Sequence, residues 1–221
     1  AVDLGRRDLQ TIDPEGGLVV LAAPVYGGRI PALVAERLKG VNGTGRKAVT
    51  LAVYGVRAYE DALLELNRVA EEQGFQVIAS AAVVAQHSIV PEVGAGRPDD
   101  RDREEILAFA KKVLEKLESG TDSPVEVPGN YPYKDGMRVE ATPVSLPDCT
   151  RCGVCEGVCP TGAVRLTEGA VATSLEKCIL CMACTAACPE QARALPRPMQ
   201  EGLNRKLGAL KEVRRENEFF L

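Results

Sequence analysis

Length, composition and charge exclude several classes of protein. The chain has 221 residues and a net charge of −4, with 45% hydrophobic and 26% charged residues. This balance is typical of one large or two modest globular domains, not of a disordered or fibrous chain. The acidic charge argues against nucleic acid as a partner, and the longest apolar run, Leu18–Val25, is too short for a membrane span. We expect a soluble, cytoplasmic protein.

The first 118 residues alternate strand-like and helix-like patterns. Continuous apolar runs, typical of strands buried on both faces, alternate with segments that carry apolar residues at helical spacing. This alternation predicts βαβ units and an α/β domain over residues 1–118, with a doubly wound parallel sheet. The expected strands are residues 17–23, 47–53 and 75–84, and the expected helices are residues 32–39, 60–73 and 102–117.

Three further segments follow in the chain. Residues 119–145 contain several prolines and glycines, which predicts an extended connector. Residues 146–196 hold all eight cysteines and form the second predicted domain. Residues 197–221 are expected to form a C-terminal helix that either packs onto the body of the protein or docks a partner. Its apolar stripe comprises Met199, Leu203, Leu207, Leu210 and Val213.

The cysteines form an internal repeat. Residues 149–163 read CTRCGVCEGVCPTGA, and residues 178–192 read CILCMACTAACPEQA. Both copies have the pattern C-x2-C-x2-C-x3-C-P, the spacing with which bacterial ferredoxins hold [4Fe–4S] clusters. Two zinc sites or four disulfides are the alternatives. Zinc needs only paired C-x-x-C knuckles, and disulfides would be spread through a small domain, so we predict two [4Fe–4S] clusters.

The repeat also predicts how the ligands divide between the clusters. In two-cluster ferredoxins the fourth cysteine of each motif ligates the other cluster. Loss of a single cysteine should therefore disturb both clusters. The first cluster is expected on Cys149, Cys152, Cys155 and Cys188, and the second on Cys178, Cys181, Cys184 and Cys159.

Two loops at strand ends are candidates for a ligand site. In a doubly wound sheet, ligands bind beyond the carboxyl ends of the strands. Each of these two loops carries a tyrosine, then glycine and arginine, a set that suits a flavin ring or is simply a turn with a half-buried ring. The residues concerned are Tyr26, Gly27, Gly28 and Arg29 after the first strand and Tyr54, Gly55 and Arg57 after the second. His87 follows the third strand and is interpreted as a hydrogen-bonded loop histidine, with a role near a cofactor as the alternative.

Three segments together with the cysteine module resemble a known family, the EFR1 family of fused flavodoxin-like and ferredoxin proteins. The segments are PVYGGRIP, VYGVRAYEDALLEL and QHSI followed by GRPDDRD. The resemblance covers Asp3 to Leu195 and implies a flavodoxin-like fold that binds FMN. It adds Pro24 to the flavin-contacting residues of the first loop.

The sequence departs from this family at its N-terminal side. Flavodoxin-like proteins open with a strand, a phosphate loop and a helix, and none of these is recognisable here. Residues Ala1–Leu4 resemble the second strand instead. We expect an N-terminal truncation, because a sheet without its middle strand would expose unpaired edges; the alternative is a domain that cannot bind FMN in the usual way.

These features favour an electron carrier over a substrate-specific oxidoreductase. No proton-transfer dyad or nucleophile pair is recognisable, so the chemistry belongs to the cofactors. We expect an iron–sulfur flavoprotein that passes single electrons between FMN, two [4Fe–4S] clusters and a redox partner protein. One alternative is a ferredoxin whose α/β domain is a flavin-free docking scaffold, and another is a flavin-dependent reductase of a small substrate. The oligomeric state is not predicted.

Overall fold

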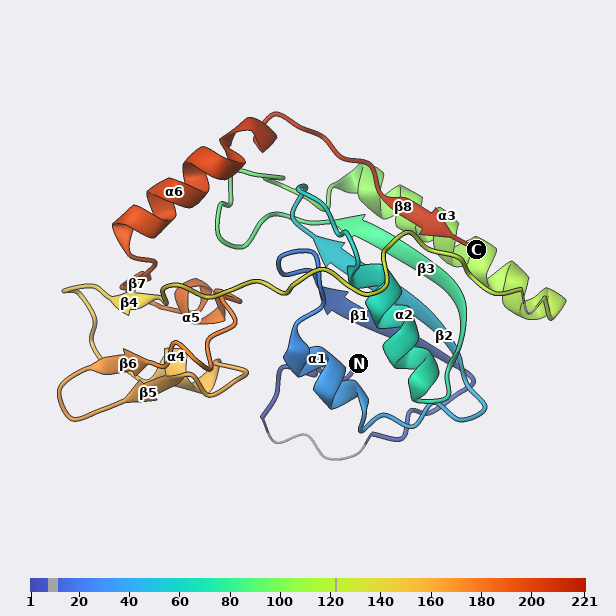
Figure 1. The fold of residues 1–221 in the computed structure, drawn as a ribbon, viewed down its shortest axis with the longest axis horizontal. Helices are drawn as coiled ribbons and strands as arrows, with labels where there is room; N and C mark the ends of the chain where they lie inside the picture. The colour runs from blue at the N-terminus through green and yellow to red at the C-terminus, as the bar shows by residue number, and fades with distance from the viewer. Residues whose placement is uncertain (8–11, 122) are drawn as a thin grey trace. The chain divides into compact units, whose positions relative to one another are not determined.

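The computed structural model describes residues 1–7, 12–121 and 123–221 (Figure 1). These residues form two compact units. One consists mainly of residues 138–209, together with residues 88–90 and the N-terminal segment, and we call it the cysteine unit. The other holds most of the chain before residue 138 and also residues 210–221, and we call it the α/β unit.

A four-stranded sheet forms the centre of the α/β unit. Its strand order is β1-β2-β3-β8. The first three strands, which are the three apolar runs of the sequence, pair in parallel, and β8 pairs antiparallel with β3. The strands are β1 (Leu18–Pro24), β2 (Lys47–Tyr54), β3 (Gln76–Val84) and β8 (Glu218–Phe220).

Helices cover both faces of this sheet (Figure 1). On β2, Thr50 donates a 2.5 Å hydrogen bond to Asn67 of α2, whereas Val49 packs with Phe109 and Val113 of α3. Because successive side chains of a strand point to opposite faces, α2 and α3 lie on opposite faces of the sheet. The helices of this unit are α1 (Ala32–Leu38), α2 (Ala62–Glu72) and α3 (Asp100–Ser119).

The strand expected at Ala1–Leu4 is wrong. These residues form no strand, and they belong to the cysteine unit instead of the sheet. The Asp3 carboxylate accepts a 2.7 Å hydrogen bond from the Gly5 N–H, and the Asp3 backbone carbonyl accepts a hydrogen bond from the Arg6 N–H. This local turn uses the backbone groups that strand pairing would need.

The C-terminal helix is shorter than expected. Helix α6 (Arg197–Leu207) is followed by a single 3₁₀ turn, η1 (Gly208–Leu210), and the chain then runs extended into β8. The Asn217 side chain accepts from the Val84 N–H at 2.9 Å and donates to Asp102 at 2.9 Å. These long-range bonds hold the tail at the sheet edge, and for this reason the predicted helix over residues 197–221 is wrong beyond its first half.

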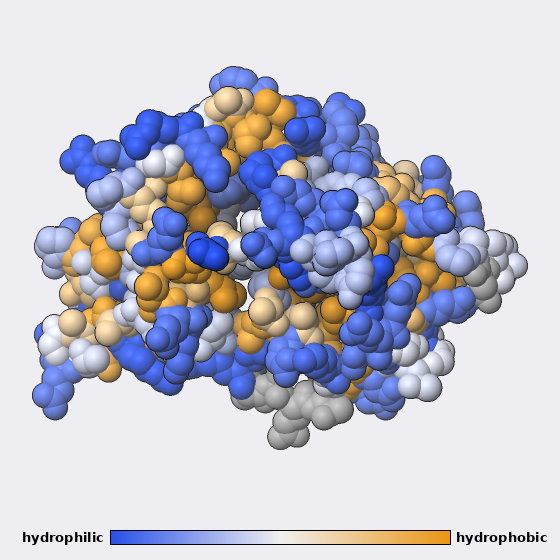
Figure 2. Space-filling model, viewed as in Figure 1, coloured by the Kyte–Doolittle hydropathy of each residue, from blue (hydrophilic) through white to orange (hydrophobic). Residues whose placement is uncertain are grey.

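Two short antiparallel two-stranded sheets and two single-turn helices form the regular structure of the cysteine motifs. β4 (Val144–Ser145) pairs with β7 (Arg193–Ala194), and β5 (Val164–Leu166) pairs with β6 (Val171–Thr173). Helices α4 (Val154–Gly157) and α5 (Ala183–Ala186) occupy equivalent places in the two sequence repeats. Apolar residues are visible over this unit, at the left of Figure 2. No helix in the described part of the chain has the length and apolar character needed to cross a membrane.

Candidate metal centre

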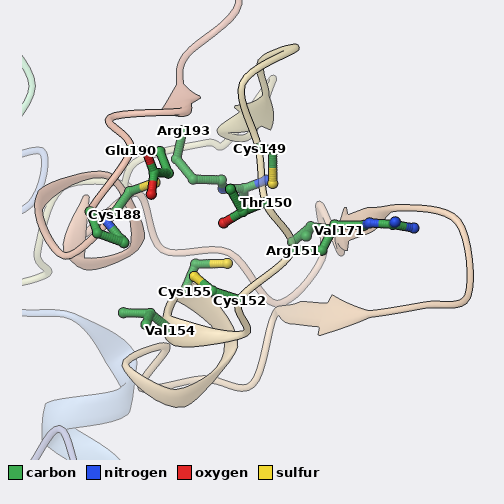
Figure 3. Close-up of a pocket in the computed structure, with 11 residues that line it drawn as sticks. Cys149, Thr150, Arg151, Cys152, Val154, Cys155, Val171, Cys188, Glu190 and Arg193 are labelled. Carbon is green, nitrogen blue, oxygen red and sulfur yellow. The ribbon is translucent and has the colours of Figure 1, made fainter.

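The eight cysteines line two separate cavities in the cysteine unit. The two halves of the repeat form sites of similar size. None of the cysteines forms a disulfide. Each cavity holds three cysteines of one motif and the fourth cysteine of the other. The first is lined by Cys149, Cys152, Cys155 and Cys188 (Figure 3), and the second by Cys178, Cys181, Cys184 and Cys159.

The backbone of both motifs adopts left-handed conformations at equivalent positions. In the first motif Arg151 and Gly153 have φ values of 56° and 81°. In the second, Leu180 and Met182 have φ values of 52° and 61°. Alternation of left- and right-handed residues turns successive N–H groups toward one side, which makes a concavity for anions. A cluster held by four thiolates carries negative charge. Binding of such a cluster would explain why non-glycine residues adopt this conformation in both motifs.

Backbone N–H groups also reach the sulfur atoms. The Ala163 N–H donates to Cys159 Sγ at 3.2 Å, and the Ala192 N–H donates to Cys188 Sγ at the same distance. Burial raises the pKa of Cys159, but the Thr161 hydroxyl and nearby backbone N–H groups reverse this effect and hold that pKa below its ordinary value. Cys159 is therefore prepared to act as a thiolate.

Four other cysteines have the opposite tendency. Burial raises the pKa of Cys155, Cys178, Cys181 and Cys184 above the ordinary value of a thiol. Thiolates are the form that binds iron, so metal binding at these positions displaces protons. The positive charge of bound iron would stabilise the thiolate form of these buried cysteines.

The two cavities share one core. Buried residues from both motifs form a single apolar cluster, against which Cys149 and Cys178 also pack. The arrangement excludes water from the space between the sites and links their structures. The buried members of this cluster are Cys155, Cys159, Ala163, Val164, Val171 and Cys184.

Zinc is the alternative metal for these cysteines. Zinc requires four ligands within about 2.3 Å of a single centre. Four cysteines spread around a cavity fit a multi-iron cluster better, because each thiolate then binds a different iron.

Sequence reasoning did not single out Arg193, which lines the first cavity and is only 4% exposed. Alignment of the two repeats offers the signal that could have found it. The first repeat has Val164 at the equivalent position, so the second repeat carries a cation where the first has a buried apolar residue.

The loop after β1 forms a tight turn instead of an open ligand site. Tyr26 and Arg29 exchange backbone hydrogen bonds across Gly27 and Gly28, whose φ values are 63° and 88°. Positive φ at both central residues is the geometry of a two-residue hairpin turn. A Cβ at Gly28 would lie 1.8 Å from Glu60 Oε2. The turn and this close approach account for the glycines without a ligand.

The charged and aromatic groups of the two loops are engaged within the α/β unit. Arg29 donates from Nε and Nη2 to the Glu65 carboxylate, at 2.7 and 2.6 Å, and from Nη1 to the Lys134 carbonyl at 2.7 Å. Arg57 donates to Glu60 at 2.5 Å. Tyr54 is only 4% exposed and packs edge-on against Tyr59, with ring centroids 5.4 Å apart.

Residues 130–137 of the connector lie over these loops. The Tyr133 ring lies 4.5 Å from the Arg29 guanidinium, and Lys134 Nζ binds Glu60 at 2.6 Å. Pro24 ends β1, and a Cβ at Gly27 would lie 2.8 Å from Met137. In the loops as folded, Arg29 is therefore engaged by Glu65 and by residues 130–137, and Tyr54 is buried.

His87 lies beside the second loop. A Cβ added to Gly55 would come within 2.7 Å of the His87 ring, and the His87 N–H donates to the Val93 carbonyl at 3.0 Å. Burial, with a smaller contribution from Arg57, lowers the pKa of His87. Its contacts are those of a packed loop histidine.

Comparison with known proteins assigns the cysteine unit only. Residues 148–193 match the family model described as a 4Fe-4S dicluster domain. A search of curated proteins finds no match to the chain. The matched region contains every cysteine and both cavities, and it supports an iron–sulfur electron-transfer role. This part of the chain is a ferredoxin-like [4Fe–4S] domain.

Proposed function

We propose that the protein is an electron carrier in which two [4Fe–4S] clusters accept single electrons and pass them to a protein partner. The observation that carries the proposal is the division of the eight cysteines into two cavities of four. A [4Fe–4S] cluster supplies one-electron chemistry over a wide range of potentials. The cysteine sets hold the clusters, and the N–H···S bonds and apolar core set their environment.

The first cavity is the proposed site of electron exchange with the partner. Cys152 is the exposed member of the eight cysteines. Val154 and Val158, which lie in and directly after α4, are 39% and 40% exposed. Apolar side chains around an exposed ligand suit a transient protein contact, because they exclude water from the point where the electron crosses.

The α/β unit serves in this proposal as a flavin-free scaffold, derived from a flavodoxin-like fold of the EFR1 type. The support is the closed state of its loops, where Glu65, Glu60 and residues 130–137 satisfy the groups expected to contact FMN. Electron transfer through FMN is the second candidate. It is favoured by the position of Tyr26, Arg29 and Arg57 beyond the carboxyl ends of two adjacent parallel strands, and it requires residues 130–137 to withdraw.

An anaerobic cofactor count tests both candidates. Iron, acid-labile sulfide and released flavin are measured per chain after reconstitution with iron and sulfide and incubation with FMN. We expect about eight irons, about eight sulfides and no flavin. Zinc in place of iron and sulfide would overturn the cluster assignment. About one FMN per chain would overturn the flavin-free scaffold and support electron transfer through FMN.

A matched variant shows whether the connector controls flavin binding. Asp135→Asn changes an exposed charge of the connector, whereas Asp61→Asn removes the carboxylate that binds the Asn130 and Lys134 N–H groups, each at 2.8 Å. If the scaffold interpretation holds, neither variant binds FMN. Binding by Asp61→Asn alone would identify residues 130–137 as a cover over a flavin site.

A further inference from the structure

Arg193 is a buried cation between the two cysteine motifs. It lies in β7 opposite Ser145 of β4, and it is 4% exposed. Its guanidinium donates to Ser145 Oγ at 3.1 Å, to the Pro143 carbonyl at 2.9 Å and to Thr173 Oγ1 at 2.7 Å. In Figure 3 the side chain extends from its strand into the ring of cysteines that lines the first cavity.

The charge of Arg193 has no acidic counterpart among the described residues. All three acceptors are neutral oxygens, and no carboxylate of the described chain forms an ion pair with it. Its Nε is buried without a hydrogen-bond partner. A buried unpaired charge is costly, so an anion must compensate it in the working protein.

The cysteine sites supply that anion. Arg193 lines the first cavity, and two of its acceptors, Pro143 and Thr173, line the second. The cation therefore acts on thiol groups of both motifs. Four thiolates around a cluster give each site a net negative charge, and this charge becomes more negative by one unit when the site accepts an electron.

The fold itself does not require a cation at this position. Val164 is the equivalent residue of the first repeat; it is 1% exposed and belongs to the shared apolar core. An apolar residue thus fills the same place in the other half. The exchange of valine for arginine breaks the two-fold pattern of the repeat and adds a buried charge together with hydrogen bonds to Ser145, Pro143 and Thr173.

We propose that Arg193 sets the reduction potential of the cluster pair by stabilising the additional negative charge of the reduced protein. The inference rests on the proposed function and adds a tuning residue to it. A fixed positive charge in a low-dielectric interior favours the more negative state, so it raises the potential at which an electron enters. One electron is gained from an external one-electron donor, and no proton or ligand is exchanged.

Other charges at the first cavity are less well placed to have this effect. Arg151 points away from the cysteines in Figure 3, and Glu190 lies on the exposed rim. Water and ions screen such exposed groups. Arg193 therefore combines burial with direct access to the cysteines.

The test compares variants that separate the charge of Arg193 from its hydrogen bonds. Arg193→Gln retains hydrogen-bonding capacity and removes the charge, whereas Arg193→Lys retains the charge and loses the planar fork. Thr173→Val removes one acceptor and leaves the charge, and Arg165→Gln removes an arginine that is 60% exposed. The reduction potential of each reconstituted protein is read from a redox titration followed by electron paramagnetic resonance.

We expect the first one-electron reduction to become about tenfold less favourable in Arg193→Gln, a decrease of about 59 mV. Arg193→Lys, Thr173→Val and Arg165→Gln should remain close to the native potential. Equal potentials in all variants, or an equal decrease in Arg193→Lys and Arg193→Gln, would overturn the inference, the latter by showing a structural role. Failure of the native chain to take up iron and sulfide would instead overturn the proposed function.

Discussion

At the scale of single residues, His87 reports on the closed loops of the α/β unit. It is the one histidine of the chain, so its ring protons give an isolated signal in a nuclear magnetic resonance titration. Burial, with a smaller effect of the Arg57 cation, holds its pKa below the ordinary value. Both effects depend on the packing of the second loop, where Gly55 leaves room for the ring.

We predict that His87 titrates at a lower pH than a histidine in an unfolded chain, whose pKa is about 6.5. Since folding favours the neutral ring, the stability that His87 contributes is present above about pH 6.5 and is lost as the pH falls through the lower folded pKa. Arg57→Met should raise the midpoint, because it removes the neighbouring cation. Arg101→Met, which changes an exposed arginine of α3, should leave the midpoint unchanged; an equal shift in both variants would contradict the local cause.

At the scale of elements, Asp61 ties the connector to the start of α2. The carboxylate is 1% exposed and accepts from the Asn130 N–H, the Asn130 side-chain amide and the Lys134 N–H. Burial alone would raise the pKa of Asp61, but these donors and the Arg29 cation keep it below its ordinary value. The carboxylate thus stabilises the fold at neutral pH, and this contribution is lost as the pH falls through the folded pKa.

We predict that Asp61→Asn destabilises the α/β unit by about 1–3 kcal/mol, because the amide keeps only one acceptor oxygen and its NH2 group faces an N–H donor that the second carboxylate oxygen had bound. Residues 130–137 should then be cleaved faster by a nonspecific protease. Denaturant unfolding and timed proteolysis measure the two effects. Asp135→Asn makes the same chemical change at an exposed position of the connector and should behave as the native chain. A native cleavage rate in Asp61→Asn would show that Asp61 does not hold residues 130–137 in place.

Local pattern was sufficient to predict some elements and insufficient for others. The apolar runs that became β1, β2 and β3 are strands because their own residues favour burial on both faces. Strand β8 has only three residues, and it depends on Asn217, whose partners Val84 and Asp102 are remote in sequence. No local periodicity encodes such contacts, so the tail was expected to remain helical.

The same distinction applies to the two candidate sites. The grouping of the cysteines was expected from the repeat and its ferredoxin pattern, and the assignment of ligands to the two clusters stays a prediction. The tyrosine–glycine–arginine loops looked open because their partners are not adjacent to them in the chain: Glu65 binds Arg29 from α2, and Lys134 binds it from the connector. A local motif does not reveal whether its hydrogen-bond donors are free to bind a ligand or already bound to residues that are distant in sequence.

At the scale of the whole molecule, the crossed arrangement of the cysteines should make the two motifs interdependent. Cys159 belongs to the first motif but lines the second cavity, and Cys188 belongs to the second motif but lines the first. Crossing joins segments that are distant in sequence, so each cluster would link both halves of the unit. Ligation within each motif would leave the halves independent.

Two double variants distinguish these arrangements. With crossed ligation, Cys149→Ser with Cys188→Ser removes two ligands of the first site and none of the second. We predict that about half of the native iron remains, with one paramagnetic signal that is altered because both motifs hold both sites. Cys149→Ser with Cys159→Ser damages both sites, and we predict that neither signal keeps its native form, although the same number of thiols is lost. Ligation within each motif predicts the reverse order. Iron content and electron paramagnetic resonance of the two reconstituted variants, measured side by side, therefore decide whether the pairing of cysteines in the cavities is also the pairing in the loaded protein.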